Sequence, residues 1–177
     1  MTRNGVVERE VGASLVLELV LELVLEDERW GDEAALQRRL DEIAPKIAVH
    51  PAARIIDRMI ATVVLADDAV VRDLNARFRH QDKATNVLSF PAGETVGGDA
   101  DEPVLLGDVI LAYETVEREA ETDGVTRDHH LAHLVVHGVL HLVGHDHIDE
   151  GEATVMEAVE TTILATLGIG DPYAELG

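Results

Sequence analysis

The segment His137–His147 constrains this chain more than any other stretch, because it reads His-Gly-Val-Leu-His-Leu-Val-Gly-His-Asp-His. His137 and His141 are four residues apart, so an α-helix places both imidazoles on one face. Gly144 lets the chain end that helix and turn, which would bring His147 back towards the pair. Three imidazoles arranged in this way predict a metal site of the catalytic type, with one position open for water or substrate.

The composition directs any metal to nitrogen and oxygen ligands. The 177 residues suit one domain, and the absence of cysteine excludes thiolate ligands and disulfides.

A net charge of -21 argues against broad electrostatic binding to nucleic acid or anionic membranes, although a local basic cleft is compatible with it. The N-terminus has no secretory signal pattern, and the apolar run Leu15–Leu25 is short and contains Glu18 and Glu22. We therefore expect a cytoplasmic enzyme.

Hydrophobic periodicity predicts a single α+β domain, residues 1–177, with a small mixed sheet packed against helices and a loose tail at 1–12. Leu15–Glu26 repeats Leu-Val-Leu-Glu three times, which favours a half-buried strand over a helix with a stripe of glutamates. The other predicted strands are Met59–Leu65, Thr85–Phe90 before Pro91, and Leu105–Ala112. A flexible hairpin loop is expected over Ala92–Pro103. The predicted helices are Asp32–Ile47, Asp67–Phe78, Tyr113–Asp123, Thr126–Leu142 and Asp149–Leu167, the last ending at Gly168.

The histidine spacing alone leaves the ligand set open. His133 lies one turn before His137 and borders the predicted site, while His145 is either a competing ligand or a surface residue beside the turn. Asp146 either orients a ligand imidazole or caps the next helix. Imidazole ligands suit zinc, nickel, copper or iron, and zinc is the expected metal. Metal-dependent proteases have glutamate directly after the first histidine, whereas this chain has Gly138, which disfavours a peptidase.

A second group of polar residues precedes the predicted strand Thr85–Phe90. Arg77, Arg79 and Lys83 precede that strand in an otherwise acidic chain. Guanidinium groups bind phosphate through paired hydrogen bonds, so this group is either a seat for an anion or a solvated helix end.

Several motifs together resemble the YbeY family of bacterial metal-dependent endoribonucleases, which act in ribosomal RNA maturation. They are His-Gly-x-Leu-His-Leu-x-Gly-x-Asp-His, Leu-Asn-x-x-x-Arg, Thr-Asn-Val-Leu-Ser-Phe-Pro, Leu-Leu-Gly-Asp-Val-Ile and Gly-Ile-Gly-Asp-Pro-Tyr, in family order between about Ala66 and Tyr173. The resemblance implies an α+β fold, zinc bound by His137, His141 and His147, and Arg79 as the catalytic arginine. It thereby favours phosphate binding by the basic group.

The implied activity is hydrolytic, single-strand-specific cleavage of ribosomal RNA, notably at the ends of the small-subunit RNA, and a part in ribosome quality control. The implied partners are ribosomal RNA and the small ribosomal subunit or an associated protein; we expect no DNA or membrane partner. Asp146 is the one candidate general base near the ligands, and either water or the ribose 2′-hydroxyl is the attacking group. His145 stands where the family usually has tyrosine. The alternatives are a non-catalytic ribosome-assembly factor with a structural metal and a metal hydrolase of another substrate.

Overall fold

The computed structural model describes residues 17–93 and 102–174. The predicted tail at 1–12 and most of the predicted loop Ala92–Pro103 lie outside these ranges. Four strands form one sheet in the order β1-β2-β4-β3. They are β1 (Glu18–Leu25), β2 (Arg58–Ala66), β3 (Val87–Pro91) and β4 (Val104–Ala112).

The sheet is mixed, as the sequence predicts. β1, β2 and β4 are parallel, whereas β3 runs antiparallel to β4 at the edge of the sheet. The structure extends β3 by one residue beyond the prediction, because Pro91 still pairs with Gly107. Ala112 and Ala92 donate backbone hydrogen bonds across this pair on either side of Pro91, to Asn86 and Leu106 respectively. The nitrogen of Pro91 therefore faces away from β4, where a strand tolerates proline.

Five α-helices follow the predicted boundaries within a few residues. They are α1 (Glu33–Ala48), α2 (Asp68–Arg79), α3 (Tyr113–Asp123), α4 (Arg127–Leu142) and α5 (Glu150–Thr166). Asp32, Asp67, Thr126 and Asp149 accept backbone hydrogen bonds at the N-termini of α1, α2, α4 and α5, which explains where these helices begin. Two short 3₁₀ helices, Glu28–Trp30 and Pro51–Ala53, complete the described elements.

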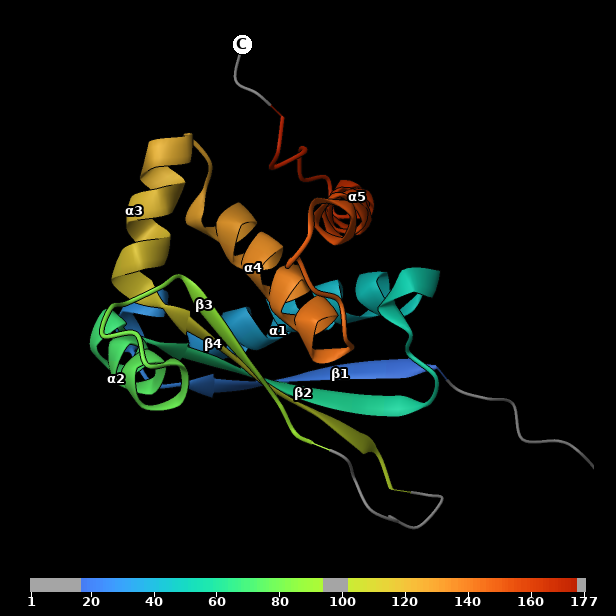
Figure 1. Ribbon diagram of the computed structural model, residues 1–177, viewed down its shortest axis with the longest axis horizontal. Helices are drawn as coiled ribbons and strands as arrows, with labels where there is room; N and C mark the ends of the chain where they lie inside the picture. Colours follow the sequence, from blue (N-terminus) through green and yellow to red (C-terminus); the bar gives the residue numbers. More distant parts are fainter. Residues whose placement is uncertain (1–16, 94–101, 175–177) are drawn as a thin grey trace, which may run out of the picture.

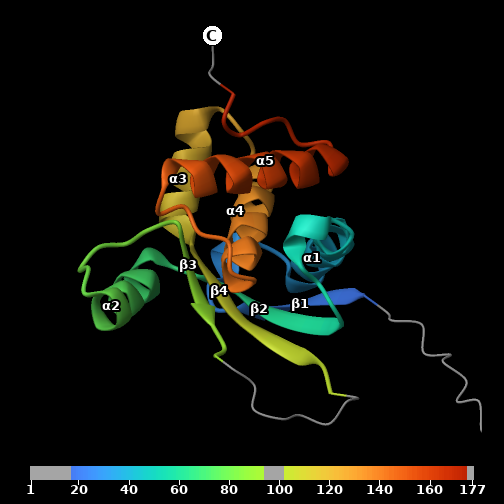
Figure 2. The ribbon, with the colours of Figure 1, turned by 45° about the vertical axis from the view of Figure 1, so that its right-hand side comes forward.

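Helices cover both faces of the sheet, and the two-residue period of the strands separates two clusters of apolar residues. Val63 and Val109 belong to the larger cluster, together with residues of α1, α4 and α5. Val64 and Ile110 belong to a smaller cluster with Val71 of α2. Figures 1 and 2 show α4 lying between the sheet and α5. This arrangement places the histidine-bearing helix directly against the sheet.

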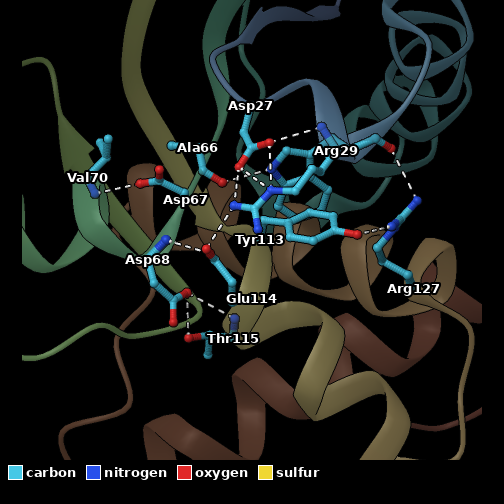
Figure 3. A network of polar contacts seen from close by, with 11 residues as sticks. Asp27, Arg29, Ala66, Asp67, Asp68, Val70, Tyr113, Glu114, Thr115 and Arg127 are labelled. Carbon is cyan, nitrogen blue, oxygen red and sulfur yellow. Dashed lines mark hydrogen bonds and ion pairs between the residues drawn. The ribbon is translucent and has the colours of Figure 1, made fainter.

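A network of polar contacts joins the carboxyl ends of β1 and β2 to α3 (Figure 3). Arg29 contacts both Asp27 and Glu114, at 2.5 and 2.8 Å. Hydrogen bonds from Arg29 hold the pKa of Asp27 below its usual value. The buried Trp30 indole donates to the Ala66 carbonyl at 2.9 Å in the same region. Hydrogen bonds and ion pairs between these side chains therefore hold this end of the sheet to α3.

No helix within residues 17–93 and 102–174 is long and apolar enough to span a membrane.

Candidate metal centre

Helix α4 presents three histidines along one side. His133, His137 and His141 are spaced by four residues, and the rings of His137 and His141 are 4.6 Å apart, centroid to centroid. Most other side chains of the helix are apolar and buried, among them Val135, Val136 and Val139. The helix is therefore held firmly against the core, and its histidine side borders the candidate site.

The turn after α4 brings the third imidazole to this side. Gly144 has a φ of 99°, and its backbone N–H donates to the His141 carbonyl while that of His145 donates to Leu140. This pair of hydrogen bonds is the Schellman motif, which ends a helix at a residue with positive φ. His147 then lies with its ring 4.9 Å from that of His141 and 5.7 Å from that of His137, centroid to centroid.

The three predicted ligands therefore lie together. One ring nitrogen from each of His137, His141 and His147 lies within 4.8 Å of the others, so the group could hold a metal ion. Burial, together with the neighbouring His137 and His147, lowers the pKa of His141 to about 4. His141 is consequently neutral at physiological pH, the form in which imidazole binds metals.

A buried carboxylate that the sequence analysis missed contacts the first of these histidines. Glu160 of α5 is fully buried, and its Oε1 lies 2.5 Å from His137 Nδ1. Burial alone would raise the pKa of Glu160, but hydrogen bonds with His133, His137 and Tyr173 outweigh it and lower the pKa to about 2. The available signal was its position, because Met156, Val159, Glu160, Ile163 and Leu164 recur at helical spacing and only one of them is charged.

His145 lies outside the group of three histidines. Its Nε2 lies 2.6 Å from the carbonyl oxygen of Ala52, which makes this nitrogen a donor to the backbone. This hydrogen bond uses the Nε2 of His145, so that nitrogen is not free to bind a metal. Asp146 is exposed and accepts the backbone N–H of His147 at 2.7 Å, rather than a ligand imidazole. It does not cap the next helix either, because Asp149 is the residue that caps α5.

Arg79 faces the same cleft as the three histidines. This cleft has a volume of about 730 Å³ and is lined on one side by the region from α2 to β3 and on the other by the end of α4. Arg79, the last residue of α2, donates from Nη2 to the carbonyl oxygen of Ser89 at 3.0 Å. Asn75 is buried and donates to the carbonyl of Lys83, which holds the loop between Arg79 and β3. Arg79 and Lys83 of the predicted basic group therefore share one cleft with the three histidines. Arg77 does not line this cleft and instead pairs with Asp73 on the exposed side of α2, at 2.9 Å.

Gly138 lies where α4 packs directly against the sheet. A Cβ at this position would be 2.4 Å from Cγ1 of Val109, which is fully buried, and 3.2 Å from Oγ of Ser89. The Ser89 hydroxyl also donates to the Gly138 carbonyl at 3.1 Å. The site therefore has no room for the glutamate that metal-dependent proteases have at this position.

The fold and the site together define a single-domain α+β protein with a candidate metal centre of three histidines in an open cleft that also holds an arginine. The family profile of endoribonuclease YbeY matches residues 26–168. This chain is 47% identical to endoribonuclease YbeY of a Bradyrhizobium species, over 87% of this chain and 92% of the relative. It is 50% identical to that of Bradyrhizobium diazoefficiens, over 81% and 76% of the two chains. The chain belongs to the endoribonuclease YbeY family.

A solved structure agrees with this fold. The solution structure of TM1509 from Thermotoga maritima matches with a TM-score of 0.51 and 22% identity, over 89% of this chain and 98% of that protein. At this identity the likeness bears on the fold alone.

Proposed function

We propose that this chain is a zinc-dependent endoribonuclease that hydrolyses single-stranded RNA during ribosomal RNA maturation, notably at the ends of the small-subunit RNA, and in ribosome quality control. The observation that carries the proposal is the placement of His137, His141, His147 and Arg79 around one cleft. Membership of the endoribonuclease YbeY family supports RNA as the substrate.

The donor set fits a catalytic zinc ion. His137, His141 and His147 would hold it, and three protein ligands leave one position for water or substrate. Zinc in such a site supplies a hydroxide at neutral pH, because it lowers the pKa of bound water to about 7. Nickel or another transition metal would suit the same ligands, since imidazole binds several of them.

Arg79 is suited to bind the scissile phosphate. Its hydrogen bond to Ser89 orients the guanidinium on the cleft wall, and most of its five donors remain for a phosphate group. A guanidinium in this position would stabilise the negative charge that develops on the phosphate oxygens. Asp146, exposed in the same cleft beside His147, is the candidate that would accept a proton from the attacking water or ribose hydroxyl.

The acidity of the chain bears on how RNA reaches this cleft. With a net charge of -21, the protein surface as a whole repels a polyanion, whereas Arg79 and Lys83 line the cleft itself. RNA is therefore bound locally, and the small ribosomal subunit or a protein associated with it presents the strand. The chain acts as one domain in the cytoplasm.

Two substitutions test the proposal. Replacing His141 with alanine should abolish stoichiometric zinc binding, measured by metal analysis of the purified protein, because it removes one of the three ligands. Arg79→Ala should keep zinc but lower the rate of RNA cleavage by about 10²- to 10³-fold, the usual cost of losing one group that stabilises transition-state charge. The substrate would be ribosomal RNA with mapped cut ends, with and without a chelator.

The outcomes separate the proposal from its rivals. Full zinc retention in His141→Ala would remove the metal assignment, and unchanged cleavage in Arg79→Ala would remove Arg79 from catalysis. A metal-loaded wild-type protein that cuts no RNA, yet is needed for ribosome assembly, would instead identify a non-catalytic assembly factor.

A further inference from the structure

Glu160 is the most unusual charged residue in the described core. It is 0% exposed, and it occupies one position of the apolar stripe by which α5 packs on the rest of the protein. Burying a carboxylate is costly unless hydrogen-bond donors surround it, and an apolar side chain would fill this position at no such cost. A charged residue here therefore indicates a role besides packing.

Both carboxylate oxygens of Glu160 have donors. Oε1 lies 2.5 Å from Nδ1 of His137. Oε2 accepts from the hydroxyl of Tyr173 and lies 3.3 Å from Nε2 of His133, and this Nε2 is also 3.1 Å from the Tyr173 hydroxyl. The carboxylate thus links α4, α5 and the segment that follows α5.

The segment after α5 is folded so that Tyr173 reaches Glu160. Asp171 accepts from the hydroxyl of Thr161 at 3.2 Å and from the backbone N–H of Tyr173 at 2.9 Å. These contacts tie residues 171–173 back onto the helix that carries Glu160. The tyrosine hydroxyl is thereby kept beside the carboxylate and the histidines of α4.

The contact with His137 determines which of its ring nitrogens can bind a metal. A carboxylate accepts only from a protonated nitrogen, so Nδ1 of His137 carries the hydrogen and Nε2 carries the free lone pair. That Nε2 lies 3.0 Å from Nε2 of His141, on the side where the three histidines meet. Rotation of the His137 ring would break the bond to Glu160.

We propose that Glu160, held by Tyr173, is a positioning residue of the metal centre: it fixes the tautomer and the orientation of His137 so that Nε2 is presented to the metal. The inference rests on the metal-binding part of the proposed function and is independent of the RNA substrate. It also makes the segment after α5 part of the support of the metal centre.

The test compares two glutamates of the same helix in the full-length chain. Glu160→Gln removes the buried charge and keeps the shape of the side chain. Glu157→Gln makes the same chemical change three residues earlier, at an exposed position that lines the hollow of about 220 Å³ beside His137 and His147. Zinc and cobalt(II) affinities are measured by competition with a chelator, together with the visible spectrum of the cobalt form and the thermal stability of the metal-free protein.

Glu160→Gln should bind zinc about 10- to 100-fold more weakly than the wild type, the usual cost of losing a group that orients a metal ligand. Its cobalt spectrum should also change, whereas Glu157→Gln should match the wild type in both measurements. A purely structural role would lower the melting temperature of the metal-free protein and leave the affinity and the spectrum unchanged; that result overturns the inference.

Tyr173→Phe keeps the test decisive if Glu160→Gln does not fold, because it removes one donor without changing any charge. It should weaken zinc binding measurably, but less than Glu160→Gln, and an unchanged affinity would count against the proposal. A wild-type chain that binds neither metal overturns the metal site itself, and a wild type that binds metal but cuts no RNA fails only the proposed function.

Discussion

The contact between α4 and the sheet at Gly138 leads to a quantitative prediction for Gly138→Ala. In a helix exposed to solvent this change would stabilise the protein by about 1 kcal/mol, because alanine is the better helix former. Here the new methyl group would be 2.4 Å from Val109 Cγ1, about 1.1 Å inside the ordinary carbon–carbon contact of ~3.5 Å. Val109 is fully buried and its branched side chain is short, so the helix or the strand has to move.

Overpacking of this kind typically costs about 1–3 kcal/mol, and an approach of 2.4 Å to a fully buried side chain places Gly138→Ala in the upper part of that range. A cost of about 2–3 kcal/mol exceeds the gain of about 1 kcal/mol in helix propensity. We therefore expect a net loss of about 1–2 kcal/mol in the free energy of unfolding. For a chain of this size that corresponds to a melting temperature lower by roughly 2–8 °C, measured by circular dichroism or calorimetry on metal-free protein. The displacement of α4 relative to β3 should also weaken RNA cleavage, since His137 is on the helix and Ser89, which holds Arg79, is on the strand.

Two further variants isolate the cause. Gly151→Ala places the same methyl group in α5 at an exposed position, where the nearest atom is Oδ1 of the exposed Asp149 at 3.2 Å. A shift of a few tenths of an ångström in that solvent-exposed side chain accommodates the methyl group, so this variant should not lower the melting temperature. Val109→Ala is destabilising by itself, but Gly138→Ala should cost much less in that background, because the clashing methyl groups are gone. If Gly138→Ala were as stable as the wild type, the close approach of α4 to β4 would be refuted.

The remaining predictions concern the network at the end of the sheet and the uninvolved histidine. Arg29→Met should lower the free energy of unfolding at pH 7, because the guanidinium lowers the pKa of Asp27 and contributes to lowering that of Glu114. Carboxyl groups with a lowered pKa contribute stability above their unfolded pKa of about 4, and this contribution is lost as the pH falls through that range. The difference in the free energy of unfolding between wild type and Arg29→Met, measured by urea denaturation, should therefore be present at pH 7 and shrink towards pH 3. An equal difference at pH 7 and pH 3 would contradict the ion pairs of Arg29 as its cause. His145→Ala should leave zinc at the wild-type stoichiometry, because its Nε2 is bonded to the Ala52 carbonyl. The lost hydrogen bond should cost about 0.5–1.5 kcal/mol, visible as a melting temperature lower by a few degrees, and loss of zinc in this variant would instead identify His145 as a ligand.

The sequence by itself determined those features that depend on neighbours within one or two turns of the chain. Period-two and helical patterns located the strands and helices. The grouping of His137, His141 and His147 was predictable for the same reason, because a helix face and a glycine turn bring them together without help from distant residues. Spacing alone left His133 and His145 open as further candidates, and the family motifs selected the three.

Tertiary structure decided every feature that depends on contacts between distant segments. The order of the strands, the hydrogen bond of His145 to Ala52 and the approach of Arg79 to the histidines all join residues far apart in the sequence. Glu160 is the clearest case. Its spacing in the sequence indicates that it lies in the core, but the spacing does not indicate which residues it contacts there. A buried carboxylate is stable only where donors converge, and His133 and His137 of α4 and Tyr173 of the C-terminal segment converge on it only once the helices have packed.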